Sequence, residues 1–189
     1  MMPKPKDEIK DKTEGSESIT FRIGKTVMGE LRQEAEQKME SVNTLVNQII
    51  KSYLQWHKPA RKAGLGYVSK VLMAKSINHL TDEQVIQMTQ EFCSNELKDI
   101  TFMLRSENTF SSFMDGLCSW LDASGYNYRI DTVNDIDTYI IQFDMGRNWS
   151  LHINTCMQII FERYGMKNAH CEMTDNAIMI KYNRKDAGV

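Results

Sequence analysis

Two histidines and two cysteines in the C-terminal half of the chain could bind a soft metal ion. His152 and Cys156 are four residues apart in a helical pattern, which puts them on one helix face. His170 and Cys171 follow on a predicted strand, and Cys and His are ligands that zinc prefers. Successive strand residues point to opposite sheet faces, so only one of this second pair could join such a site. We expect the alternative, in which the cysteines fill the core, the histidines are half-exposed and no metal or other cofactor is bound.

The sequence contains none of the motifs typical of an enzyme active site. It has no glycine-rich phosphate loop, no GxSxG elbow and no HExxH pair. Aspartates near a predicted turn could take part in acid–base chemistry, but we expect them only to keep that turn hydrated. We therefore predict that the protein is not an enzyme. These aspartates are Asp131, Asp135, Asp137 and Asp144.

Methionine and aromatic side chains are frequent in the C-terminal half. They could line an adaptable apolar pocket, but such residues more often form the core, which is what we expect here. The residues are Phe102, Met103, Phe110, Phe113, Met114, Trp120, Met145, Trp149, Met157, Phe161, Met173 and Met179.

Near the N-terminus, polar and apolar residues alternate in the stretch SITFRI, residues 18–23. This period of two predicts a half-buried strand. No second strand pattern lies nearby, and an unpaired strand edge invites another strand, so we expect it to pair with its own copy in a second chain. Such a two-stranded ribbon fits the major groove of B-DNA, where Arg, Ser and Thr bond to base edges. Ser18, Thr20 and Arg22 would lie on the face toward DNA.

Two helices are predicted directly after this strand. The first is expected from about Val27 to Met39, with Thr26 as its N-cap, and the second from Ser41 to near Trp56, before Pro59. The amide groups at the start of the second helix would suit a phosphate. The apolar residues expected in the shared dimer core are Ile19, Phe21, Ile23, Leu31, Leu45, Val46, Ile49 and Ile50.

With SITFRI as the ribbon and SVNTLVNQIIKSYL as the second helix, residues 17–56 resemble the ribbon-helix-helix family of Arc and MetJ. The resemblance implies an obligate dimer that reads bases with Ser18, Thr20 and Arg22. It also implies that Ser41, Val42 and Asn43 meet the DNA backbone, and we add Lys25 as a further phosphate contact. Many family members have Gly just before the Ser that opens the second helix. Here Met39-Glu40 precede Ser41, and the Glu40 charge would repel a phosphate.

The charge distribution agrees with an anionic partner for this part of the chain. Residues 18–62 carry eight Lys or Arg and four Glu, a net charge of +4, whereas the whole chain has a net charge of −2. No stretch is apolar enough to cross a membrane, and the cysteines form no disulfide framework. We therefore expect a cytoplasmic protein with reduced cysteines.

The remaining sequence predicts an α+β domain. After a linker at 58–66 come helical patterns, a capping box at Thr81 and Gln84, and a helix that ends at Gly125. Two hairpins follow, turning at Asn134-Asp135 and Asp175-Asn176 and separated by a helix from Asn148 or Ser150 to Tyr164. The fold class is therefore an N-terminal ribbon-helix-helix unit followed by helices and an antiparallel β-β-α-β-β domain. The expected divisions are a disordered arm at 1–16, a DNA-binding unit at 17–57, the linker, the α+β domain at 67–183 and a tail at 184–189.

We expect a homodimeric transcriptional regulator that binds double-stranded DNA through an intersubunit ribbon. Its C-terminal domain would sense a small-molecule effector or extend oligomerisation, for example to a tetramer. The alternative is an antitoxin-like repressor whose C-terminal domain binds a partner protein.

Overall fold

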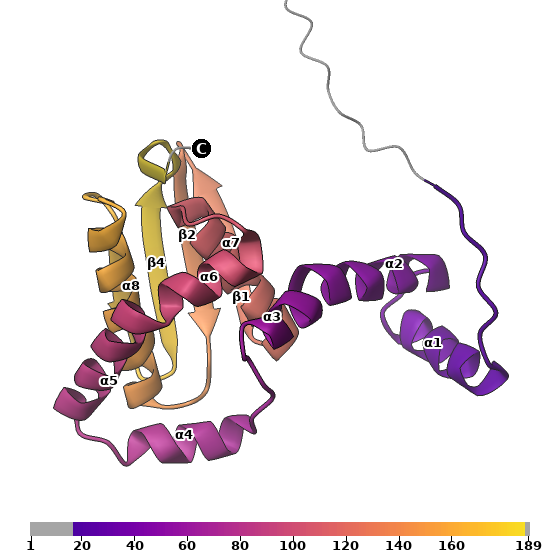
Figure 1. Ribbon diagram of the computed structural model, residues 1–189, viewed down its shortest axis with the longest axis horizontal. Coiled ribbons are helices and arrows are strands. Elements are labelled where there is room, and N and C mark those ends of the chain that lie inside the picture. The colour runs from indigo at the N-terminus through magenta and orange to yellow at the C-terminus, as the bar shows by residue number, and fades with distance from the viewer. Residues whose placement is uncertain (1–16, 188–189) are drawn as a thin grey trace, which may run out of the picture. The chain divides into compact units, whose positions relative to one another are not determined.

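The computed structural model describes residues 17–187. These residues form two compact units, one up to Val46 and the other from Asn47 onward (Figure 1). Among residues 17–187, no helix combines the length and the apolar character needed to span a bilayer.

The first unit contains an extended segment, one complete helix and the start of another. Residues 17–24 have no regular secondary structure within the single chain, where a strand was expected at 18–23. Helix α1 (Lys25–Gln37) follows, and α2 (Val42–Ser52) begins in this unit and continues into the second. Ala35 of α1 and Leu45 of α2 are its buried apolar residues.

The ends of α1 differ from the predicted ends. Gly24 rather than Thr26 is the N-cap, and no side chain caps the helix. The helix ends at Gln37 because Met39 adopts the left-handed conformation, with φ 54°. The Met39 amide donates to Glu36 O and the Glu40 amide to Ala35 O, which is the Schellman arrangement that normally has glycine at this position.

The helix that was expected to end near Trp56 is longer. After α2 the chain forms a π-helical turn, η1 (Tyr53–His57), and then α3 (Lys58–Lys62). The predicted linker at 58–66 therefore begins with a helix, and the irregular backbone that follows runs from residue 63 to residue 69.

Pro59 does not end this helix because its missing hydrogen bond is replaced. Pro59 has no N–H for the carbonyl of Gln55, four residues earlier. That carbonyl accepts instead from Nη1 of Arg105, at 2.9 Å. Arg105 also donates to Asp115 O at 2.7 Å and to the Ser119 hydroxyl. A single arginine thus holds the π-helical turn against the helices that follow.

Five further helices follow in the second unit. The capping box at the start of α5 is confirmed, with Thr81 and Gln84 each bonding to the other's backbone amide. The end of α7 at Gly125, with φ 62°, is also confirmed. The helix between the hairpins begins at Arg147, slightly before the predicted start. These helices are α4 (Lys70–Asn78), α5 (Asp82–Asn95), α6 (Leu97–Arg105), α7 (Phe110–Ser124) and α8 (Arg147–Arg163).

The strands form one four-stranded antiparallel sheet in the order β1-β2-β4-β3. The two predicted hairpins are confirmed, and Asn134 and Asp135 both have positive φ, as a tight hairpin turn requires. The strands are β1 (Asn127–Val133), β2 (Ile136–Gln142), β3 (His170–Met173) and β4 (Ala177–Asn183). The predicted α+β class with β-β-α-β-β order is therefore confirmed for this unit.

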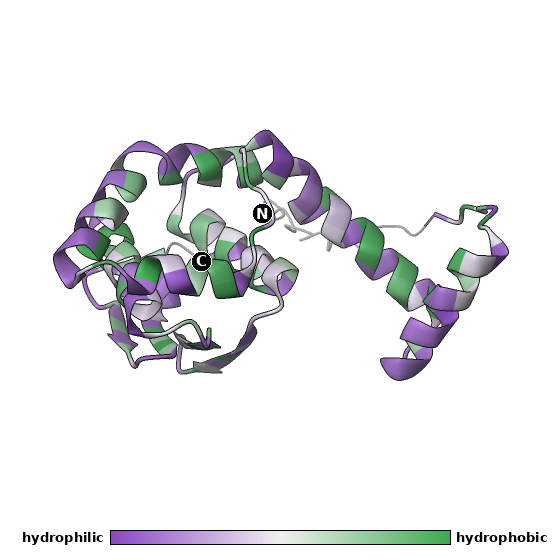
Figure 2. Cartoon of the chain, turned by 90° about the horizontal axis from the view of Figure 1, so that it is seen from below, coloured by the Kyte–Doolittle hydropathy of each residue, from purple (hydrophilic) through white to green (hydrophobic). Residues whose placement is uncertain are grey.

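Helices cover one face of this sheet. On β2 and β4, alternate side chains are buried, including Tyr139, Ile141, Ile178 and Ile180, and those between them are half-buried or exposed. Helices α4, α5, α7 and α8 all supply residues to the same core, and α4 and α5 contact α8. Figure 2 shows the helices of this unit on one side and the strands on the other.

Most of the methionine and aromatic residues form the core, as expected. Phe110, Phe113, Met114, Met145, Trp149, Met157 and Phe161 are buried. Phe102 and Met103 of α6 are exposed, contrary to this expectation.

Candidate functional site

The three polar residues predicted to read bases all lie on the extended segment before α1. Ser18, Thr20 and Arg22 are exposed, and Lys25, the first residue of α1, is exposed as well. Their side chains are therefore accessible to a large partner.

The apolar residues between them are exposed too. Ile19, Phe21 and Ile23 have exposed fractions of 74%, 55% and 37%. Of the remaining residues predicted for a dimer core, Leu45 is buried within the single chain, whereas Ile49 and Ile50 are exposed. Leu31 and Val46 are half-buried. Ile49 and Ile50 form an exposed apolar stripe along α2 and η1 with Tyr53 and Leu54, and Figure 2 shows recurring green bands along this helix.

The Ser41 side chain caps the start of α2. The Ser41 hydroxyl accepts a hydrogen bond from the Thr44 amide at 3.0 Å and lies 2.8 Å from the Thr44 hydroxyl. Val42 begins the helix and is half-buried, and Asn43 is exposed. Glu40 directly precedes this cap, so a carboxylate lies close to the predicted phosphate contact.

The second unit contains an apolar cavity of about 250 Å³ between its helices. Its wall comes from every helix between α4 and α8 and includes Trp56 of η1. No Lys, Arg, Asp or Glu lines it, and its few polar side chains include those of Thr101 and His152. The Thr101 hydroxyl is already used, because it donates to Leu97 O at 2.8 Å.

Two residues of this wall retain hydrogen-bonding capacity, Trp149, whose buried indole N–H has no partner, and His152. Its Nδ1 lies 2.7 Å from the hydroxyl of Thr89, a fully buried residue of α5. That hydroxyl donates its one proton to Val85 O at 2.7 Å, so Nδ1 must carry the proton that joins His152 to Thr89. Burial lowers the pKa of His152 to about 4. The ring is therefore neutral near pH 7, and its Nε2 is an acceptor.

The sequence pattern of α5 indicates that Thr89 is buried but not which residue it contacts. Val85, Thr89 and Cys93 are four residues apart on the buried face of α5. This spacing predicts a buried threonine, but it does not show that the neighbour across the core is a histidine 63 residues later.

The structure does not assemble the four candidate metal ligands. His170 is exposed and bonds to Glu172 at 2.7 Å, whereas Cys171 is buried on the other sheet face. Cys156 pairs with Cys93 of α5, and this contact and burial raise the Cys156 pKa. Within residues 17–187, no group of three or more His, Cys, Asp or Glu is placed to hold a metal ion, and all four cysteines are unbridged.

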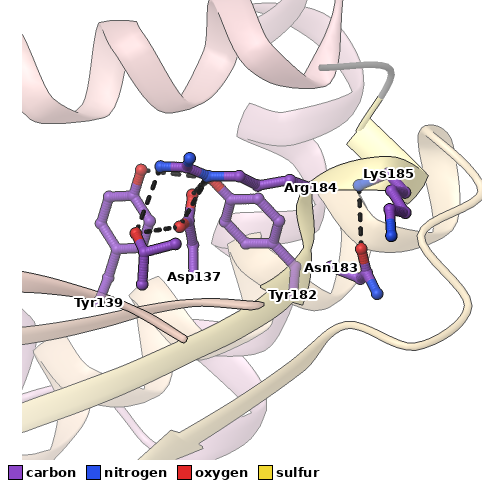
Figure 3. A network of polar contacts seen from close by, with 7 residues as sticks. Asp137, Tyr139, Tyr182, Asn183, Arg184 and Lys185 are labelled. Carbon is purple, nitrogen blue, oxygen red and sulfur yellow. Dashed lines mark hydrogen bonds and ion pairs between the residues drawn. The ribbon is translucent and has the colours of Figure 1, made fainter. Parts of the chain in front are cut away.

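A polar cluster lies where β2 begins and β4 ends (Figure 3). Asp137 of β2 is only 4% exposed and accepts two bonds of 2.9 Å from Arg184 Nε. Burial alone would raise the Asp137 pKa, but bonds from Arg184, Thr132 and Tyr182 together lower it. The expectation that this aspartate only hydrates a turn is wrong.

The residues after β4 are likewise more than a tail. Residues 184–187 form a 3₁₀ turn, η2 (Arg184–Ala187), in which Arg184 reaches Asp137 and Lys185 lies 2.6 Å from Asp135. Local sequence patterns do not indicate the pairing of Arg184 with Asp137, because the two residues are 47 positions apart in the sequence. The cluster has a structural role, since its polar atoms are paired with one another and join β2 to β4 and to the residues that follow β4.

Comparisons of the chain with protein-family models, with curated proteins and with solved structures find no match.

Proposed function

We propose that this protein is a homodimeric, sequence-specific DNA-binding regulator of transcription. In this proposal residues 17–56 act as a ribbon-helix-helix unit and the second unit senses a ligand or extends oligomerisation. The observation that carries the proposal is the exposure of large apolar side chains at alternate positions of residues 18–23. The later part of α2 and η1 also carries exposed apolar side chains, and exposed apolar residues of this kind indicate a protein interface.

A second copy of the same segment is the partner that best fits these residues. Residues 18–23 have unpaired backbone groups, and two copies can satisfy them by forming an antiparallel pair about a twofold axis. The period of two then points Ile19, Phe21 and Ile23 of both chains to one face, where the exposed side chains of α2 can cover them.

The opposite face of that ribbon would carry six polar side chains. Ser18, Thr20 and Arg22 from each chain would form it, at the width that the major groove accepts. Arginine can donate two hydrogen bonds to guanine, so Arg22 would contribute most of the base discrimination. Lys25 and the start of α2 would hold phosphates on either side.

The first test is selection of binding sites by the full-length protein from a random DNA library. The expected result is a palindromic consensus, because twofold-related ribbons read twofold-related half-sites. Affinity should also fall steeply with salt, since basic residues displace counterions from DNA. No enrichment of any sequence would contradict the proposal. A protein that co-purifies through residues 67–183 would then favour the antitoxin-like alternative.

Arg22→Ala tests the ribbon directly. It should weaken binding to the selected site by on the order of 1–3 kcal/mol and relax the preference at one base position of each half-site. The matched control is Arg32→Ala, which removes the same charge from an exposed position of α1. Equal losses in the two variants, or unchanged selectivity in Arg22→Ala, would contradict the assignment of the ribbon.

A further inference from the structure

The apolar cavity of the second unit has the size and shape of a small-molecule site. Its volume of about 250 Å³ exceeds the roughly 150 Å³ that suffices for benzene in an apolar protein cavity. It therefore suits a molecule of about two fused rings. Because no charged residue lines the wall, an ionised molecule would lose its hydration without gaining a counter-charge.

His152 offers a hydrogen-bond acceptor to such a molecule, beside the unpaired indole N–H donor of Trp149. Thr89 does not line the cavity, so the Nδ1 edge of His152 faces away from it. The Nε2 edge lies on the opposite side of the ring, and within residues 17–187 no hydrogen bond to Nε2 is found. A neutral imidazole fixed with its proton on Nδ1 can only accept at Nε2.

The aromatic wall adds a preference for flat molecules. Trp149 and His152 are neighbours in this wall, with ring centroids 5.3 Å apart, and Trp120 and Trp56 also line the cavity. Aromatic side chains favour stacked or edge-to-face contact with another ring.

We propose that this cavity binds an uncharged, mainly apolar small molecule with one or two rings, whose hydroxyl or N–H donates a hydrogen bond to Nε2 of His152. Trp56 links this site to α2, because it lies in η1, which continues that helix. The π-helical turn at this position is bounded by the Lys58 amide bonding to Tyr53 O, and such turns occur frequently at functional sites. Filling the cavity would shift Trp56 and thereby change DNA binding, a step that rests on the proposed function.

The binding step is tested by calorimetry on the full-length protein with two matched compounds. Indole has an N–H donor, and benzothiophene has almost the same shape without it. Indole should bind about tenfold more tightly, as expected for one additional hydrogen bond. If neither compound binds, or if both bind equally, the proposal is overturned.

Variants assign the effect to His152. His152→Leu should retain benzothiophene binding and reduce the tenfold preference for indole to near one. Thr89→Val should also reduce the preference, because it removes the acceptor that holds the proton on Nδ1. The control is His170→Leu, an exposed histidine on β3, which should leave the preference unchanged. A full preference in folded His152→Leu would overturn the role of Nε2. If that variant does not fold, 1-methylindole, which lacks the donor, must bind the wild type as weakly as benzothiophene.

The coupling step is tested separately by measuring affinity for the selected DNA with and without saturating indole. A change of several-fold would support the coupling through Trp56. An unchanged affinity, with indole binding demonstrated by calorimetry, would overturn the coupling and leave the binding site. If the protein binds no DNA at all, the proposed function fails, while the calorimetry still decides whether the site exists.

Discussion

At the scale of single residues, side chains of the same type differ in burial and in hydrogen-bond partners. His152 and His170 both belong to the C-terminal half of the chain. His152 is enclosed by helices and holds one proton on Nδ1 against Thr89, whereas His170 is exposed beside Glu172. The aspartates differ in the same way, because Asp137 is buried against Arg184 and Asp135 is exposed beside Lys185.

The lowered pKa of His152 predicts a pH dependence of stability. Its pKa is about 4 in the folded chain against an ordinary value of 6.5, so between these values the unfolded chain binds more protons. The free energy of unfolding should have its full value above about pH 6.5. It should fall by roughly 3 kcal/mol as the pH drops toward 4. Urea denaturation at several pH values measures this slope.

His152→Leu should remove this component of the slope, because leucine does not titrate. His170→Leu should retain it, because His152 is unchanged in that variant. A wild-type slope that persists in full in His152→Leu would show that other groups produce it.

At the scale of secondary structure, two element ends depend on residues that local patterns disfavour. Pro59 would normally end the helix that continues α2, but Arg105 supplies the hydrogen bond that the Gln55 carbonyl lacks. Met39 occupies the left-handed position between α1 and α2, where a side chain costs about 1–2 kcal/mol relative to the right-handed conformation.

Met39→Gly should therefore stabilise the protein. Met39 is 94% exposed, so its side chain contributes little packing, and glycine adopts positive φ without the steric penalty. Part of the gain is offset by the greater entropy of glycine in the unfolded chain, which leaves up to about 1 kcal/mol. Urea or thermal denaturation of the full-length protein measures the difference.

Met39→Ala is the matched control, because alanine removes the side chain but keeps the Cβ that causes the strain. It should give no gain. If alanine and glycine stabilise equally, the backbone conformation of residue 39 is not the cause.

At the scale of the whole molecule, the question is what covers the exposed apolar residues of the N-terminal part. The proposed twofold dimer buries Ile19, Phe21 and Ile23, and a charge introduced there would lie in an apolar core. Phe21→Glu should therefore convert a dimer into a monomer at micromolar concentration and abolish specific DNA binding. Analytical ultracentrifugation with a DNA-binding assay checks both effects.

Met103→Glu provides the control, because Met103 is about as exposed as Phe21 but lies on α6 of the second unit. It should remain a dimer and bind DNA normally. A dimer that survives Phe21→Glu would show that the self-association lies elsewhere in the chain.

The sequence by itself determined the elements whose signals are local. The capping box at Thr81, the end of α7 at Gly125 and the turn at Asn134-Asp135 depend on the conformational preferences of a few adjacent residues. The β-β-α-β-β order followed from these signals and from the change in hydrophobic period, so the α+β class of the second unit was predictable.

Only the tertiary structure decided which distant residues meet. Thr89 fixes the proton of His152, Arg184 neutralises Asp137, and Arg105 completes the helix interrupted by Pro59, over separations of 63, 47 and 50 residues. None of these pairs leaves a periodic pattern, because each depends on how packed helices and strands bring side chains together. The cavity beside His152 arises in the same way, as the space that five helices and a π-helical turn leave between their apolar faces.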